Sequence, residues 1–274
     1  MATRPRLAVM KFASCDGCQL TLLDAEDELL PLMDLVHLSH FAEASSRLED
    51  GPYDVTLVEG SILTEEDRHR IQELRTKSRF LVTIGACATG GGIQALRNFA
   101  NHEDWIRTVY ARPEYIQTLS TSTPISAHVP VDFELRGCPV DKQQLLEVVL
   151  SFARGFRPKT STESVCQPCK RKGTVCVVVA QNLPCLGPVT QAGCGSICPA
   201  HDRGCYACFG PSAQPNTSSL AKHILLPRMS PRESGMFLRS FHAASPPFEQ
   251  ASTSLIHAAQ ASDQNSSNEK ARSE

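Results

Sequence analysis

Residues 79–88 read RFLVTIGACA, an apolar run with almost no alternation between polar and apolar positions. Such a run is typical of a strand that is covered on both faces of a parallel sheet. Similar short runs occur earlier in the chain, at RLAVMKF (6–12), DLVHLS (34–39) and YDVTLVEG (53–60). They predict further strands of the same sheet.

Segments with helical spacing separate these strands. TEEDRHRIQELRTK (64–77) starts with Thr64, three residues before Asp67, which is typical of a helix N-terminus. Helices are also predicted over residues 21–33 and 140–154. The alternation of strands and helices predicts an α/β fold with a doubly wound parallel sheet.

The composition changes after residue 157. Residues 166–211 contain eight Cys, six Gly and five Pro, too little apolar surface for a core, so metal sites would have to hold the segment together. Beyond it, SLAKHILLP and ESGMFLRSF predict short helices, and the Ser-, Ala- and Asn-rich end predicts disorder. We therefore expect an α/β domain at 1–157, a cysteine-rich domain at 158–212, a helical segment at 213–249 and a disordered tail at 250–274.

Charge and hydropathy exclude two broad functions. The chain has 274 residues and a formal net charge of −2, so it lacks the basic excess of nucleic-acid-binding proteins. It contains no apolar run of about 18 residues, so we expect no membrane span. The first residues lack the long apolar region of a secretory signal, which indicates a cytoplasmic, reducing compartment. There, the 12 cysteines favour metal ligation over disulfides.

Four cysteines lie in the first domain, each directly after an apolar or extended segment. The carboxyl ends of parallel strands meet at one edge of a sheet, where ligands of such folds usually bind. We expect one inorganic centre, either a four-iron cluster or a closed zinc site, to be surrounded by Cys15, Cys18, Cys87 and Cys138. A thioredoxin-like redox pair at Cys15 and Cys18 is an alternative that leaves the other two cysteines unexplained.

The other eight cysteines crowd into residues 166–208. Their spacing is C-x2-C-x6-C-x8-C followed by C-x3-C-x6-C-x2-C, which makes two sets of four. Two zinc sites fit this count as well as two four-iron clusters do. The Cys198–Pro199 step favours a ferredoxin-like module with two clusters. The basic residues that either offset cluster charge or form an ordinary solvated face are Lys170, Arg171, Lys172 and Arg203.

Taken together, these motifs resemble the small, electron-transferring subunit of nickel–iron hydrogenases. The matching segments are S-C-D-G-C (14–18), V-E-G-S (58–61), G-A-C-A (85–88), G-C-P (137–139), P-C-L-G-P-V-T-Q-A-G-C (184–194) and R-G-C-Y-A-C-F-G-P (203–211). The first domain also resembles the related single-cluster subunit of NADH:quinone oxidoreductase, which lacks the second group of cysteines.

The resemblance implies a flavodoxin-like domain followed by a small, loop-rich, ferredoxin-like iron–sulfur domain, with three [4Fe-4S] clusters in all. The implied ligands of a proximal cluster, here called the proximal set, are Cys15, Cys18, Cys87 and Cys138. The implied distal set is Cys166, Cys169, Cys176 and Cys185. The implied medial set is Cys194, Cys198, Cys205 and Cys208.

The resemblance also implies the type of hydrogenase and its partners. Membrane-bound relatives carry His where this chain has Cys166, carry Pro where it has Cys198, and have an export signal. These differences imply a cytoplasmic, bidirectional enzyme similar to the sulfhydrogenase delta subunits. The nickel–iron site would lie in a separate large subunit. Electrons would pass on to a flavin- and NAD(P)-binding diaphorase subunit and an iron–sulfur subunit.

Some points stay open at this stage. Glu59 ends a predicted strand on the cysteine edge, where it either lies beside a cluster or is a helix-capping or solvated carboxylate. None of the nine histidines, His201 included, is assigned a role. A subunit of a quinone- or other acceptor-linked oxidoreductase and a zinc-stabilised scaffold protein remain as alternative functions.

Overall fold

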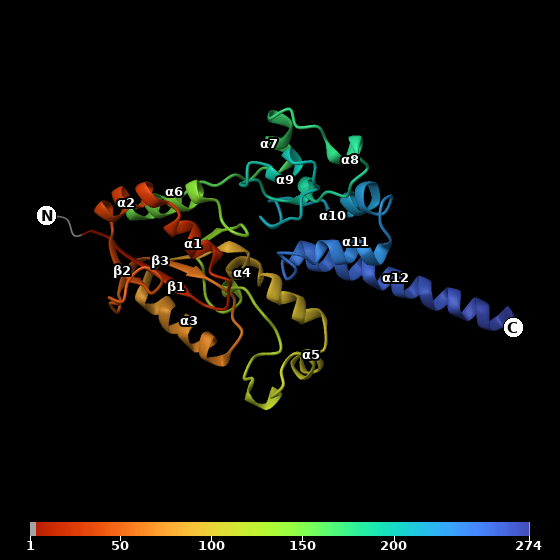
Figure 1. Ribbon diagram of the computed structural model, residues 1–274, viewed down its shortest axis with the longest axis horizontal. Coiled ribbons are helices and arrows are strands. Elements are labelled where there is room, and N and C mark those ends of the chain that lie inside the picture. Colours follow the sequence, from red (N-terminus) through yellow and green to blue (C-terminus); the bar gives the residue numbers. More distant parts are fainter. Residues whose placement is uncertain (1–3, 274) are drawn as a thin grey trace. The chain divides into compact units, whose positions relative to one another are not determined.

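The computed structural model describes residues 4–273, with side chains for residues 4–262 and 264. The chain divides into two compact units, Met1–Ser161 and Thr162–Glu274, which are described separately here (Figure 1). The division falls close to the change of composition after residue 157.

A five-stranded sheet in the order β2-β1-β3-β4-β5 forms the first unit. Its strands are β1 (Arg6–Lys11), β2 (His37–Phe41), β3 (Tyr53–Glu59), β4 (Ser78–Ile84) and β5 (Phe133–Leu135). All four neighbouring pairs are parallel. This is the flavodoxin-like order, in which the winding direction reverses between β1 and β3. The predicted doubly wound parallel sheet is therefore confirmed.

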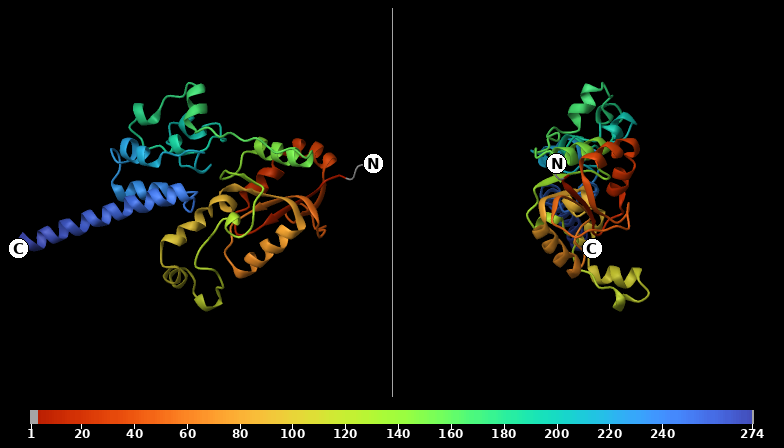
Figure 2. Two further views of the ribbon diagram at one scale, coloured as in Figure 1. Left: turned by 180° about the vertical axis from the view of Figure 1, so that it is seen from behind. Right: turned by 90° about the vertical axis from the view of Figure 1, so that its left-hand side faces the viewer.

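Helices cover both faces of this sheet (Figure 2). One face carries α1 (Gly17–Leu23), α2 (Leu29–Leu35) and α6 (Lys142–Ala153). The other carries α3 (Glu65–Lys77) and α4 (Gly85–Gly90). Because side chains alternate along a strand, Leu7 and Val9 of β1 enter the first core while Ala8 and Met10 enter the second. The three central strands β1, β3 and β4 are thus buried on both faces, as their continuous apolar runs indicate.

The predicted start of α3 is confirmed by its capping contacts. The Thr64 hydroxyl accepts a hydrogen bond of 3.0 Å from the backbone N–H of Asp67, and the Asp67 carboxylate accepts one of 3.1 Å from the N–H of Thr64. This reciprocal pair satisfies two donors that the helix itself leaves without acceptors.

The helix predicted over 21–33 is wrong in its bounds. The structure has α1 ending at Leu23, a 3₁₀ turn at Glu26–Glu28 and then α2. Pro31 lies in the first turn of α2, where a missing N–H costs no intrahelical hydrogen bond. The proline that disturbs the predicted helix is therefore accommodated at the start of a second one.

Short helical elements fill the long connection between β4 and β5. They are η2 (Ile93–Phe99), α5 (His102–Val109), η3 (Pro113–Tyr115) and η4 (Ile125–Ala127). Of these, η2 follows α4, which carries Cys87, and so lies next to the cysteine edge of the sheet.

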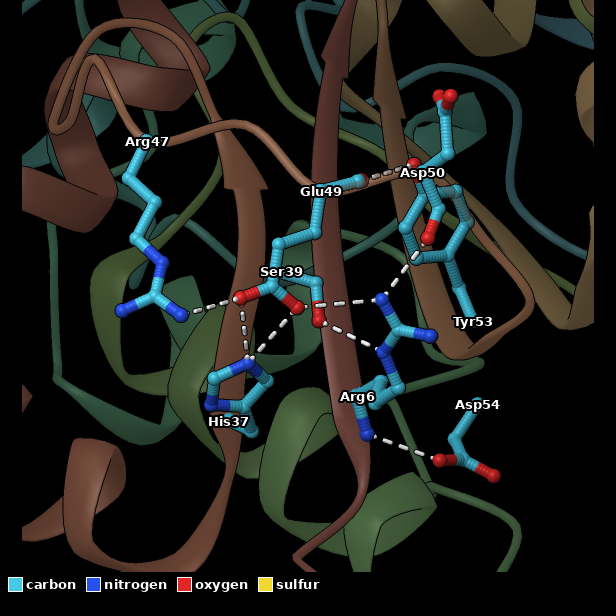
Figure 3. A network of polar contacts seen from close by, with 8 residues as sticks. All are labelled: Arg6, His37, Ser39, Arg47, Glu49, Asp50, Tyr53 and Asp54. Carbon is cyan, nitrogen blue, oxygen red and sulfur yellow. Dashed lines mark hydrogen bonds and ion pairs between the residues drawn. The ribbon is translucent and has the colours of Figure 1, made fainter.

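Polar contacts tie together the amino ends of β1, β2 and β3 (Figure 3). Arg6 donates from its backbone N–H to Asp54 at 2.8 Å and from its guanidinium to Ser39 at 3.0 Å and Glu49 at 3.2 Å. Glu49 also lies 3.1 Å from the His37 ring. This network, here called the amino-edge network, occupies the end of the sheet opposite to the cysteines.

The second unit consists of short helices and loops followed by longer helices. Its elements are α7 (Cys166–Arg171), α8 (Val177–Ala180), η5 (Gly187–Val189), α9 (Ile197–Ala200), α10 (Thr217–Leu220), η6 (Ala221–Leu225), α11 (Pro231–Leu238) and α12 (Pro246–Ser273). A small core around Val165 and Val177 also contains the sulfur-bearing side chains of Cys185 and Cys205. In this small core, cysteine side chains therefore pack beside valines.

The structure differs from the predicted tail at residues 250–274. The backbone forms α12 over Pro246–Ser273, and Phe248, Ala251 and Leu255 of this helix pack into a core with Leu186 of the cysteine-rich segment. These three residues recur at helical spacing and so form one apolar stripe. The average composition of the segment does not reveal this stripe, because three apolar residues are few among its many polar ones. Their contacts nevertheless dock the helix on an existing core.

Candidate metal centres

The proximal set lies at the carboxyl edge of the sheet. Cys15 and Cys18 follow β1, and the loop between them turns at Asp16, whose φ is 65°. Cys87 lies in α4 after β4, rather than in a strand that continues to residue 88 as predicted. Cys138 follows β5 and precedes a cis peptide bond to Pro139.

Glu59 fixes the loop that carries Cys18. It ends β3, is 1% exposed, and its carboxylate accepts the backbone N–H of Cys18 at 3.0 Å and of Gln19 at 3.3 Å. The carboxylate therefore caps α1, which is one of the roles expected for it. Its charge also lies close enough to raise the pKa of Cys18, although burial is the larger cause.

Glycines let the proximal loops approach each other. A Cβ atom on Gly85 would lie 2.4 Å from the sulfur of Cys18, and one on Gly17 would lie 3.5 Å from the sulfur of Cys15. The backbone N–H of Ala86 donates to the carbonyl of Gly137 at 2.7 Å, which joins the loops after β4 and β5. The loops therefore converge around the sulfur atoms. The glycines leave room there that a larger side chain would occupy.

The four proximal thiols lie close enough together to influence one another's pKa. The pKa of Cys87 is raised to about 11, mainly by burial and further by its neighbours Cys138 and Cys15. Burial also raises the pKa of Cys138, again with a contribution from Cys15. The pKa of Cys18 is raised by burial and then by Glu59, Cys87 and Cys138. The structure therefore brings these four residues together, as the sequence predicts.

The distal set is also brought together. The pKa of Cys166 is raised to about 11, mainly by burial and further by its three companions, Cys185, Cys169 and Cys176. A Cβ on Gly187 would lie 3.3 Å from the sulfur of Cys185 and 3.6 Å from that of Cys166. The sulfur of Cys185 accepts the backbone N–H of Cys205 at 3.2 Å and of Gly187 at 3.4 Å.

Within the medial set, Cys194 lies close to Cys198, and Cys205 lies close to Cys208. Burial raises the pKa of Cys198, and Cys194 raises it further. The pKa of Cys205 is raised by burial, with smaller contributions from Cys185 and Cys208. Among the contacts of the described residues, Cys205 is thus linked to the distal set as well as to Cys208.

The basic residues fall into two groups. Lys170 and Arg203 lie close enough to Cys166 and Cys198, respectively, to lower the pKa of these thiols against the effect of burial. Arg171 is instead paired with Glu163 at 2.7 Å, and Lys172 donates to the carbonyl of Gly195 at 2.6 Å. Lys170 and Arg203 are therefore the basic residues that offset negative charge at the cysteines.

Two residues beside the cysteines carry no signal in the sequence. Gln94 lies against Cys87, and His242 is 1% exposed with its Nε2 atom 3.2 Å from the carbonyl oxygen of Cys208. His242 therefore anchors the Cys208 loop, a supporting role that the sequence does not indicate. Its contact spans 34 residues, and nothing local in the sequence marks it. His201 is exposed, as expected.

The donor chemistry fits iron–sulfur clusters. All twelve cysteines are present as thiols, and thiolates are the ligands that such clusters take. Within the part of the chain whose side chains are described, no group of three or more Cys, His, Asp or Glu converges on the position of one metal ion. Among the described residues, no helix is both long enough and apolar enough to cross a bilayer.

Comparison with known proteins gives consistent matches. Residues 15–152 match the family model of the NADH ubiquinone oxidoreductase 20 kDa subunit. The chain is 34% identical to the sulfhydrogenase 2 subunit delta of Pyrococcus furiosus over 236 residues, which cover 86% of this chain and 98% of the relative. It is 31% identical to a subunit of the F420-non-reducing hydrogenase vhu of Methanocaldococcus jannaschii, over 75% of this chain and 81% of that one.

A solved structure supports the same relationship. A chain in the crystal structure of an NAD+-reducing [NiFe]-hydrogenase in the H2-reduced state matches with a TM-score of 0.53 and 27% identity. The match covers 95% of that chain but 57% of this one. A large part of the present chain therefore has no counterpart there.

Proposed function

Since the chain belongs to the family of the NADH ubiquinone oxidoreductase 20 kDa subunit, and within it is a hydrogenase small subunit, we propose that it relays electrons through three four-iron clusters. The observation that carries the proposal is the gathering of buried thiols from loops far apart in the sequence. Each bound cluster would supply one-electron transfer without proton chemistry at a substrate.

The proposed ligands are the proximal, distal and medial sets. The four-way coupling within the proximal set and within the distal set supports their assignment. For the medial set, support comes from the coupled pairs Cys194–Cys198 and Cys205–Cys208 and from the spacing of the cysteines.

Residues of this chain hold the ligands in place and exclude water. Glu59 fixes the Cys18 loop, while His242 holds the carbonyl of Cys208. Burial of Cys18, Cys185 and Cys205 keeps their sulfur atoms out of solvent. Such hydrogen bonds, burial and nearby charge are the means by which a protein sets a cluster potential.

We propose a nickel–iron large subunit as the partner at the proximal set, because the chain has no cysteine left for nickel once three clusters are assigned. At the other end we propose a flavin- and NAD(P)-binding subunit and an iron–sulfur subunit, in the cytoplasm. The similarity to a chain of an NAD+-reducing hydrogenase supports an NAD(P)-linked partner. The F420-non-reducing relative makes another acceptor the second candidate.

Metal analysis tests the cluster proposal. Anaerobically purified protein should contain about 12 iron and about 12 acid-labile sulfides per chain, with the broad visible absorbance of four-iron clusters. A colourless protein with two or three zinc ions would support the zinc scaffold instead. Mass spectrometry of the intact complex tests the partners, since a nickel-containing subunit should co-purify with a hydrogenase but not with a quinone-linked relative.

A further inference from the structure

Gln94 contacts three of the loops that converge at the proximal set. Its Nε2 atom donates to the carbonyl of Ala13 at 2.8 Å and to the hydroxyl of Ser61 at 3.0 Å. Its Oε1 atom accepts from the thiol of Cys87, with 3.7 Å between sulfur and oxygen. One side-chain amide thus joins the loops after β1, β3 and β4.

The orientation of this amide is fixed by its surroundings. The carbonyl of Ala13 can only accept, so a reversed amide would place two oxygen atoms 2.8 Å apart. Ser61 is fully buried, and its hydroxyl lies 2.9 Å from that of Ser122, which donates to the carbonyl of Gly91 at 3.0 Å. Nε2 therefore faces Ala13, and Oε1 faces the sulfur.

Gly92 provides the room for this contact. Its φ is +69°, and a Cβ atom there would lie 2.6 Å from Oε1 of Gln94 and 2.7 Å from the sulfur of Cys87. Any other residue would separate the amide from the thiol. The close approach is therefore part of how this loop is built.

We propose that Gln94 lowers the reduction potential of the proximal cluster by holding the carbonyl end of its amide against the sulfur of Cys87. The proposal rests on the proposed function, in which Cys87 is a ligand. A ligated sulfur has no proton to donate, so it meets the negative end of the amide dipole. Because reduction adds negative charge to the cluster, this dipole disfavours the reduced state.

Cys185 of the distal set has the opposite environment. Two backbone N–H groups point at its sulfur, and such donors favour the reduced state. Gln94 therefore acts as a positioning residue that shifts the potential of the entry cluster downward, while the N–H groups at Cys185 shift that of the distal cluster upward. Electrons from hydrogen would then move toward the distal set with a favourable free-energy change.

The test is a redox titration of the full cluster-loaded chain, followed by electron paramagnetic resonance. At the wild-type midpoint potential of the proximal cluster, Gln94→Leu should raise the ratio of reduced to oxidised cluster about tenfold, which corresponds to 59 mV. Asn98→Leu is the matched control. Asn98 lies in the same element, and its amide bonds the backbone of Ser122 at 2.8 and 2.9 Å rather than a cysteine.

The sign of the shift decides the outcome. A lower potential in Gln94→Leu would mean that an N–H group faces the sulfur, and would overturn the proposal. An unchanged potential, or an equal shift in Asn98→Leu, would overturn it as well. If Gln94→Leu does not fold, Gln94→Ala replaces it, and removal of the amide must again raise the potential. A wild-type chain without a proximal cluster would contradict the proposed function rather than this inference.

Discussion

Gly85 meets two requirements at one position of the proximal set. Its φ of +87° lies in the left-handed region, and a Cβ atom there would come within 2.4 Å of the sulfur of Cys18. Gly173 shares the first property, with a φ of +67°, but a Cβ atom there would have nothing within 4 Å. A comparison of substitutions at these two glycines therefore distinguishes the effect of backbone strain from that of a collision with the sulfur of Cys18.

Gly85→Ala should remove the proximal cluster. The methyl group displaces the sulfur of Cys18, so we expect iron to fall from about 12 to about 8 per chain, as loss of one four-iron cluster requires. Gly173→Ala should keep full iron and lose only about 1 kcal/mol of stability from its backbone conformation. Equal iron in the two variants, measured by metal analysis, would contradict the convergence of the loops on Cys18.

Cys198→Pro should convert the medial centre to a three-iron cluster. Cys198 is the second residue of α9, where a helix leaves backbone N–H groups without acceptors, so proline is tolerated there. With one thiolate missing, one iron is easily lost. The oxidised variant should show a three-iron signal in electron paramagnetic resonance.

The activities of this variant provide a second measurement. A three-iron medial cluster has a higher potential, and each 59 mV of mismatch costs roughly tenfold in a one-electron equilibrium. Hydrogen-dependent reduction of a nicotinamide acceptor should slow more than reduction of a high-potential dye. Cys15→Ala, which breaks the entry cluster, should abolish both. Full activity of Cys198→Pro with no new signal would remove Cys198 from the ligands.

Among the elements, α12 links the end of the chain to the cysteine-rich segment. Phe248 and Leu255 share a core with Leu186, which directly follows the distal ligand Cys185. Ser252 is fully buried, and its hydroxyl lies 3.1 Å from the guanidinium of Arg239 after α11. The first three turns of α12 therefore support the loop that holds Cys185.

Two truncations should show which part of α12 contributes to the stability of the second unit. Removing residues 251–274 deletes the Leu255 contact and should destabilise the second unit by about 2 kcal/mol, the value of one largely buried aliphatic side chain. Removing residues 258–274 should leave the unfolding midpoint and the iron content unchanged. Thermal unfolding of the two truncated chains is the measurement, and equal midpoints would show that the helix contributes nothing to this core.

The amino-edge network gives the sheet a pH dependence. A hydrogen bond from His37, followed by the charges of Arg47 and Arg6, holds the pKa of Glu49 below its ordinary value of 4.5. Stability from this lowered pKa is present above pH 4.5 and is lost as the pH falls through the pKa of the folded state.

Glu49→Gln should flatten this dependence. The wild-type chain should lose stability more steeply than the variant on acidification below pH 4.5, because only the wild-type carboxylate takes up a proton there. Denaturant unfolding at a series of pH values measures the difference. Parallel curves would show that the contacts of Glu49 are not maintained in solution.

For the whole molecule, local sequence signals predicted most of the first unit. Continuous apolar runs gave β1, β3 and β4 because a buried strand needs apolar residues on both faces. Cysteines placed after these strands predicted the proximal set, because parallel strands bring their carboxyl ends together. The structure ends β4 at Ile84, because Gly85 has a φ of +87° and turns the chain out of the strand.

Contacts between distant segments could not be predicted. Gln94 and His242 meet the cysteine loops through contacts that span many residues, and neither has a local motif. The docking of α12 depends on Phe248, Ala251 and Leu255, which are diluted among Ser and Gln. The average composition of this segment indicates disorder, but a few apolar residues on one face of the helix pack on an existing core and determine that the helix forms.

The spread of the proximal set along the chain has a consequence for biosynthesis. Cys15 leaves the ribosome long before Cys138, which follows the short edge strand β5. Closing such long loops is slow, and nothing can bind all four sulfurs until β5 has joined β4. Iron delivery must therefore follow translation of the first unit. Until then, the early thiols need protection from oxidation.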